Sequence, residues 1–264
     1  MLKNLPYRLY SRFARSKTKK SIDIVRVRKP QFLEAVNFMK INFLDDPFVR
    51  AMGISVRHEE TQNFLSRLWL TLLRPELSLA AVQRQKICGL CINCYQAQQQ
   101  LNSPNQTNDS TFLKLSKVAK SKGIRNLMHA WDKIDREVVF PMNDKIDNIN
   151  NNTKTLELAA CSVGYNHRRL GIAKKLIQSS TEMAMMMGFD YARIDCSHVA
   201  TAKICNQLNW QKIWEMPFEM FDGVELANMD EESSKVQVFI KKLHSYSSLN
   251  DLNKNRGKPD PNIK

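Results

Sequence analysis

A basic segment between a predicted strand and a predicted helix carries the residues that could bind an anion. Residues 163–176 read VGYNHRRLGIAKKL, which places Arg168, Arg169 and Lys174 around Gly171. The first turn of a helix presents unpaired backbone N–H groups, and its dipole favours negative charge there. Gly171 would let a phosphate approach the main chain closely. The spacing predicts a pyrophosphate site, with an ordinary loop–helix junction and a solvated basic rim as the alternative.

The composition of this segment separates it from two other phosphate-binding loops. It lacks the Gly-Lys-Ser/Thr of a Walker loop and the first two glycines of the dinucleotide-binding fingerprint. Its Arg168-x-x-Gly171-x-Ala173 pattern resembles the acyl-CoA signature of the GNAT superfamily, the CoA-dependent N-acyltransferases. The resemblance implies that loop amides hold the CoA pyrophosphate. It assigns acetyl-CoA binding to Ser162, Val163, Arg168, Arg169, Leu170, Gly171, Ile172, Ala173 and Lys174.

The order of the predicted elements agrees with that resemblance. Hydrophobic periodicity predicts strands over residues 22–28, 78–83, 87–95, 156–163, 191–196, 211–216 and 236–243, and helices over 32–43, 57–73, 112–119, 127–140, 169–187 and 200–208. Alternation of strands and helices in the second half indicates a mixed sheet with parallel neighbours. The resemblance implies the α/β GNAT fold. In that fold a mixed central sheet holds CoA in a splayed parallel strand pair and carries helices on both faces.

A second resemblance points to a residue that could act as the general base. The segment Phe43-Leu44-Asp45-Asp46-Pro47-Phe48 is similar to the Phe-x-x-Asp-Glu-Pro-Leu segment of insect and nematode arylalkylamine N-acetyltransferases. The glutamate before the proline is the proposed general base of those enzymes, so the resemblance assigns this role to Asp46, which is one methylene shorter. From the residues alone, Asp-Asp-Pro also reads as a turn that closes the helix over 32–43.

Two residues of the predicted helix 200–208 are candidate proton donors. In the resembling enzymes, serines lie at the positions of Thr201 and Cys205, and many other GNAT enzymes carry a tyrosine acid at the Cys205 position. A thiol or a hydroxyl could protonate the departing thiolate of CoA. The family also supplies an oxyanion-stabilising backbone N–H from the strand at about Val163. Packing within the helix is the alternative reading of Thr201 and Cys205.

Together these resemblances imply an acetyl-CoA-dependent N-acetyltransferase for small arylalkylamines such as dopamine, octopamine, tyramine or serotonin. A primary amine has a pKa near 10 and needs a base before it can attack a thioester. We expect direct transfer in a ternary complex of a monomer, without a metal and without a nucleic-acid partner. The alternatives are a CoA-binding protein that has lost turnover, and an enzyme that acetylates a protein amine or a polyamine.

A run of three cysteines suggests a metal site at first sight. Cys88, Cys91 and Cys94 are three residues apart, but they lie in a predicted strand. Alternation along a strand would point Cys88 and Cys94 one way and Cys91 the other, so the three thiols could not converge on one ion. Six cysteines without a secretory signal indicate reduced thiols.

The ends of the chain differ in composition from its middle. The formal net charge is +14, and residues 1–22 hold seven basic residues and no acidic one. Residues 241–264 hold six basic and two acidic residues, which leaves about +3 for the middle and argues against a basic nucleic-acid surface on the core.

This difference sets the expected boundaries. We expect a basic tail over 1–21, one domain over 22–243 with a polar insertion near 96–110, and a disordered tail over 244–264. The sequence contains no run of about 18 apolar residues, so we expect no membrane-spanning helix. The basic N-terminus resembles a mitochondrial presequence, but we expect a cytoplasmic protein.

Overall fold

A computed structural model describes most of the predicted domain. The described residues are 21–44, 46–54, 58–96, 110–138, 153–224 and 234–243. The expected tails and most of the expected insertion therefore lie outside the described residues. Among the described residues, no helix is long and apolar enough to cross a membrane.

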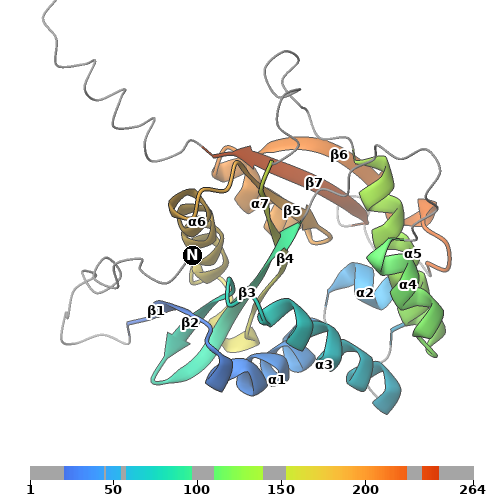
Figure 1. Ribbon diagram of the computed structural model, residues 1–264, viewed down its shortest axis with the longest axis horizontal. Coiled ribbons are helices and arrows are strands. Elements are labelled where there is room, and N and C mark those ends of the chain that lie inside the picture. Colours follow the sequence, from blue (N-terminus) through green and yellow to red (C-terminus); the bar gives the residue numbers. More distant parts are fainter. Residues whose placement is uncertain are drawn as a thin grey trace, which may run out of the picture.

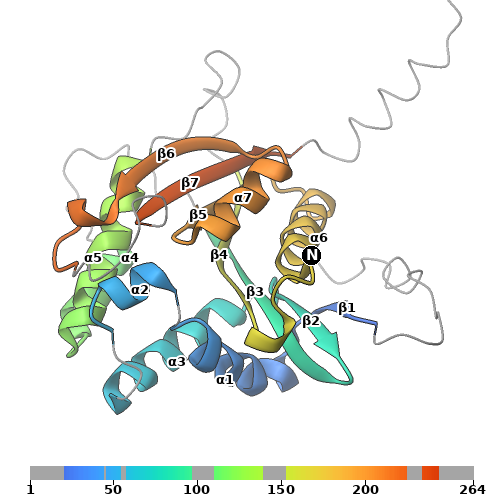
Figure 2. The same cartoon turned by 180° about the vertical axis from the view of Figure 1, so that it is seen from behind.

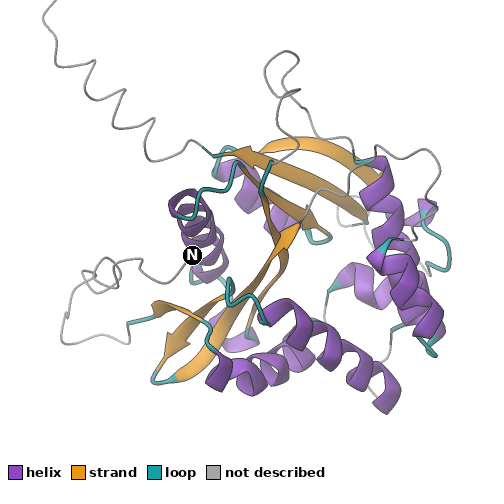
Figure 3. Ribbon diagram, viewed as in Figure 1, coloured by secondary structure: helices purple, strands orange, loops and turns teal. Residues whose placement is uncertain are grey.

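A seven-stranded sheet in the order β1-β2-β3-β4-β5-β7-β6 forms the centre of the molecule (Figures 1 and 3). Its strands are β1 (Asp23–Arg26), β2 (Leu79–Gln83), β3 (Lys86–Gln96), β4 (Thr155–Val163), β5 (Tyr191–Cys196), β6 (Gln211–Pro217) and β7 (Lys235–Lys242). Neighbouring strands are antiparallel except for the β4–β5 pair, which is parallel. The predicted mixed α/β sheet is thereby confirmed.

Helices cover both faces of the sheet, as predicted. They are α1 (Phe32–Asn42), α2 (Pro47–Ala51), α3 (Glu59–Leu73), α4 (Thr111–Val118), α5 (Lys122–Glu137), α6 (Ile172–Met186) and α7 (Val199–Gln207). Helices α1 and α3 lie on one side of β3 and β4, and α6 lies on the other (Figure 2). Apolar side chains fill a separate core on each side, with Trp69 and Met39 in one and Leu176 and Phe239 in the other.

The five-residue helix α2 is an element that periodicity did not predict. Asp46 begins this helix by accepting hydrogen bonds from the backbone N–H groups of Phe48 and Val49, and Pro47 occupies its first position. An aspartate before a proline is a favourable helix start because proline needs no hydrogen-bond partner there. The preceding helix α1 does end before this segment, as predicted, and the segment in addition starts α2, which periodicity did not predict.

The parallel strands β4 and β5 separate soon after they begin. Thr155–Glu157 pair with Tyr191–Arg193, and in the described segment 153–224 the pairing ends there although both strands continue. The part of β4 beyond Glu157 therefore has backbone groups that face β5 without pairing to it. This fork between β4 and β5 matches the splayed parallel strand pair that the GNAT resemblance implied.

A bulge in β3 changes where the three cysteines point. Val82 pairs with Ile87 and Ala81 with Gly89, so Cys88 is an extra residue in the strand. Cys88 and Cys91 both pack in the core beside α6, whereas Cys94 contacts Glu157. The prediction that Cys88 and Cys94 share a face was wrong, because strict alternation fails at a bulge.

Candidate active site

A cavity of about 2200 Å³ opens where β4 and β5 separate. Residues from both strands, from the loop before α6 and from helices α3 and α5 line it. The predicted anion loop and Asp46 both belong to its wall, although more than 100 residues separate them in the sequence. The fold therefore joins a basic loop and a carboxylate in one space.

The basic loop ends at Gly171, which begins α6 in a left-handed conformation with φ of +73°. Gly171 has no side chain that could cap this terminus, so it leaves the first N–H groups of the helix as donors for a ligand. A Cβ atom on Gly171 would meet no atom within 4 Å, which leaves open space beside the backbone. The Arg168 side chain donates a hydrogen bond to the Val163 carbonyl and lies over the Tyr165 ring. These features suit a pyrophosphate group.

Most of the residues predicted to bind CoA line the cavity. They are Ser162, Val163, Arg168, Arg169, Gly171, Ile172, Ala173 and Lys174. The exception is Leu170, whose side chain is 57% exposed and lies outside the cavity wall. Lys174 Nζ donates to the side-chain oxygen of Gln207 at 3.4 Å, so it also ties α6 to α7. The prediction for Leu170 thus extends at most to its backbone.

Asp46 also lies on the cavity wall, with both carboxylate oxygens engaged. Oδ1 accepts from the N–H groups of Phe48 at 2.9 Å and Val49 at 3.3 Å, and Oδ2 accepts from Ser197 Oγ at 2.7 Å. Burial raises the pKa of Asp46 above its ordinary value, although these hydrogen bonds and His198 oppose the shift. A raised pKa brings a carboxylate closer to the range in which it can accept a proton from an amine.

The sequence reasoning missed Ser197. This residue follows the last residue of β5 and precedes α7, and its hydroxyl links that junction to α2 across 151 positions of the chain. Its neighbour His198 begins α7, where Nδ1 accepts a hydrogen bond from the Ala200 N–H and so caps the helix. A polar residue directly after a parallel strand is a signal that could have pointed to Ser197.

No family model and no curated protein matches the sequence. Solved structures do match. Arylalkylamine N-acetyltransferase 2 from Aedes aegypti matches with a TM-score of 0.70 at 16% identity, over 85% of this chain and 100% of that one. The Drosophila melanogaster polyamine N-acetyltransferase that forms N-acetylagmatine matches with a TM-score of 0.63 at 12% identity, over 84% and 100%. The chain has the GNAT fold.

Within the GNAT fold, the two candidate proton donors of α7 have different surroundings. Thr201 lines the cavity, as do the neighbouring residues Ser197 and His198. Cys205 is fully buried, is not part of the cavity wall, and has its sulfur 3.7 Å from that of Cys196. Of the two, Thr201 is therefore the one that faces the cavity.

Aromatic side chains form a further part of the wall. They come from the segment between α1 and α3 and from α3, α4 and α5, and they are Phe43, Phe48, Phe64, Trp69, Phe112 and Trp131. The Phe43 and Trp69 rings meet edge to face with their centroids 4.8 Å apart, and the ring centroids of Phe112 and Trp131 are 5.4 Å apart. Such a wall can bury an aromatic ring beside the Asp46 carboxylate.

No metal site emerges from the described part of this GNAT fold. Among the described residues, no three His, Cys, Asp or Glu side chains are arranged to hold a metal ion. The thiols of Cys88, Cys91 and Cys94 each contact a different group: the Ala81 carbonyl, the Asn93 side chain and the Glu157 carboxylate.

Proposed function

We propose that this protein is an acetyl-CoA-dependent N-acetyltransferase that acts on small arylalkylamines by direct transfer in a ternary complex. The observation that carries the proposal is the single cavity that joins the basic loop, the fork between β4 and β5, and the Asp46 carboxylate. The basic loop is placed to bind the phosphate groups of acetyl-CoA. The Asp46 carboxylate can act as the base, and the aromatic side chains beside it can bind the amine.

The loop and the fork divide the binding of acetyl-CoA between them. The N–H groups at the start of α6, with Arg168 and Arg169 beside them, hold the pyrophosphate. The pantetheine arm then enters the fork, where the unpaired backbone groups of β4 can exchange hydrogen bonds with its amides. The same strand edge supplies an N–H donor for the oxyanion of the tetrahedral intermediate.

Asp46 accepts the first proton from the ammonium group of the amine, directly or through water. The free amine nitrogen then attacks the thioester carbon, the C–N bond forms, the nitrogen gives up a second proton, and the C–S bond breaks. The departing sulfur takes a proton from the Thr201 hydroxyl, which regains one from water. Ser197 keeps the Asp46 carboxylate oriented toward the cavity through its 2.7 Å hydrogen bond.

The acceptor follows from the wall beside Asp46. Aromatic side chains near a carboxylate suit an ammonium group that is attached to a ring. The alternative acceptor is a polyamine. It is favoured by further carboxylates on the same wall, Asp135, Glu157 and Asp195, and by the similarity to the polyamine enzyme.

A panel of amines tests this proposal. Initial rates of CoA release should be higher for dopamine, tyramine and serotonin than for spermidine or a lysine-containing peptide. Only the first three carry an aromatic ring that can pack against the aromatic side chains of the cavity wall. A tenfold preference for spermidine or for the peptide would show that the acceptor is wrong. Acetyl-CoA binding without release of CoA from any amine would favour the binding protein.

A pair of substitutions on α7 tests the proton donor. Thr201→Val should lower kcat by about 100-fold, because the departing thiolate loses its nearest hydroxyl, while the dissociation constant of acetyl-CoA stays within about twofold. Cys205→Ala should mainly lower the melting temperature, since its side chain is fully buried. Loss of turnover in Cys205→Ala with unchanged stability would instead identify the thiol as the donor.

A further inference from the structure

Glu157 lies at the inner end of the fork between β4 and β5. It is the last residue of β4 that pairs with β5, opposite Arg193, and its side chain lines the cavity. A pantetheine arm that enters from the loop before α6 can advance between the strands only until they become hydrogen-bonded to each other. On the proposed function, the thioester therefore stops close to Glu157.

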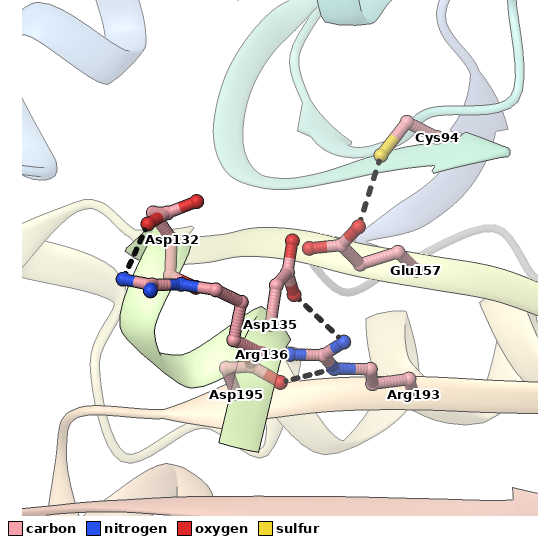
Figure 4. Close-up of polar contacts among 7 residues, drawn as sticks. All are labelled: Cys94, Asp132, Asp135, Arg136, Glu157, Arg193 and Asp195. Carbon is pink, nitrogen blue, oxygen red and sulfur yellow. Dashed lines mark hydrogen bonds and ion pairs between the residues drawn. The ribbon is translucent and has the colours of Figure 1, made fainter. Parts of the chain in front are cut away.

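The groups around Glu157 come from three other elements of the fold (Figure 4). Arg193 on β5, which is 1% exposed, holds Asp195 with two hydrogen bonds of 2.8 Å and pairs with Asp135 of α5 at 2.9 Å. From β3, Cys94 Sγ donates to Glu157 Oε2 at 3.7 Å. These contacts fix the guanidinium and both aspartates, whereas a thiol is a weak donor to a carboxylate.

These neighbours make the protonated form of Glu157 accessible near neutral pH. The pKa of Glu157 is raised to about 7: burial is the largest cause, the charges of Asp195 and Asp135 act in the same direction, and Arg193 and Cys94 oppose the shift. Asp132 of α5, the remaining carboxylate near this group, is paired with Arg136 at 2.7 Å. Glu157 is thus a carboxylate in a reaction cavity that can both take up and release a proton at neutral pH.

We propose that Glu157 is a second proton acceptor for the amine nitrogen, and that it takes the proton which the nitrogen still carries after it has attacked the thioester. The inference rests on the proposed function and adds to the role of Asp46. An ammonium ion must lose two protons to become an amide nitrogen, and Asp46 can accept the second only after it has passed the first to water, whereas Glu157 lies where the thioester stops and can accept it directly.

The proton balance of the reaction is then complete. Asp46 takes the first proton, the C–N bond forms, and the nitrogen of the tetrahedral intermediate gives its second proton to Glu157. The C–S bond breaks and the sulfur receives one proton from Thr201, which water restores. Asp46 and Glu157 return their protons to water, so one proton is released for each acetyl group transferred.

The pH dependence of turnover tests the proposal. Wild-type kcat should fall as the pH drops through about 7, because protonated Glu157 cannot accept a proton. Glu157→Gln should lower kcat by about 10- to 100-fold and remove the fall in kcat on the acidic side, which is the acidic limb of the pH profile. Its acetyl-CoA affinity, measured by calorimetry, should stay unchanged. Glu215→Gln is the matched control, since Glu215 lies on β6 outside the cavity wall, and it should behave as wild type.

A second variant leaves Glu157 in place. Asp135→Asn removes a negative charge that raises the pKa of Glu157, so the same limb should move to lower pH by about half a unit or more. If Glu157→Gln fails to fold, the position of this limb in Asp135→Asn still tests whether Glu157 accepts the proton. An unmoved limb in either variant, or a Glu157→Gln enzyme with wild-type kcat, would overturn the proposal.

The outcomes also separate this inference from the proposed function. If Asp46→Asn is inactive while Glu157→Gln turns over normally, the transferase stands and the second acceptor falls. If the wild-type protein acetylates no amine of the panel, the proposed function fails and this inference fails with it.

Discussion

Replacing Gly171 with leucine should weaken acetyl-CoA binding by at least about 100-fold, or about 2.7 kcal/mol. The left-handed backbone at φ of +73° places the first N–H groups of α6 beside open space. A leucine side chain would fill that space and keep the pyrophosphate away from the amides. Loss of one or two charge-assisted hydrogen bonds, each contributing about 1.5–3 kcal/mol, accounts for the magnitude.

The same helix offers a matched control for this experiment. Gly188 follows the other end of α6 with φ of +72°, and a Cβ there also meets no atom within 4 Å. Gly188→Leu therefore carries the same backbone strain, about 1–2 kcal/mol, without touching the loop. Both variants should lose similar amounts of thermal stability, whereas calorimetry should find lost affinity in Gly171→Leu alone. An unchanged dissociation constant for Gly171→Leu would contradict the pyrophosphate site.

Asp46→Asn should lower turnover by about 100- to 10,000-fold. The amide is close in shape to the carboxylate, and its oxygen can still accept from the N–H groups of Phe48 and Val49. Helix α2 should therefore keep its start, while the nitrogen that replaces the second oxygen cannot accept a proton. Acetyl-CoA should bind as before, which separates this variant from Gly171→Leu.

The pH profile identifies Asp46 more directly than the loss of rate. Because burial raises the pKa of Asp46, kcat/KM should fall as the pH drops through that raised value, and the base is fully available above it. Asp46→Asn should lack this limb, and Asp46→Glu should keep it. Asp190→Asn is the control, since Asp190 also accepts from a backbone N–H, that of Lys154, but lies outside the cavity wall. A normal rate for Asp46→Asn would move the base elsewhere.

Local signals in the sequence were sufficient for most of the fold. In the part of the chain that the structure describes, six of the seven α-helices and all seven strands lie within about five residues of the predicted ranges, because each buries one face and so carries a regular hydrophobic pattern. The start of α6 was also predictable, since a glycine between a basic loop and an apolar helix is a strong local signal. Helix α2 was missed because five residues are too few to show a period.

Face assignments failed where the backbone departs from regularity. The bulge at Cys88 puts Cys88 and Cys91 on the same side of β3, and nothing in the sequence announces that extra residue. Cys205 shares α7 with Thr201, yet one side chain is buried against Cys196 and the other lines the cavity. Spacing along a helix fixes relative direction, but the neighbouring elements decide which direction is the core.

The sequence by itself determined the strands, the helices, their order along the chain and the basic loop before α6, because each of these depends on residues close together in the chain. Only the tertiary structure decided that Ser197 holds Asp46 and that Glu157 sits at the end of the fork among Arg193, Asp135 and Cys94. Those contacts join residues 22 to 151 positions apart, and Glu157 takes its altered pKa from burial and from charges on other elements. Local sequence patterns carry no record of such distances, so the proton chemistry of the cavity became visible only in the folded chain.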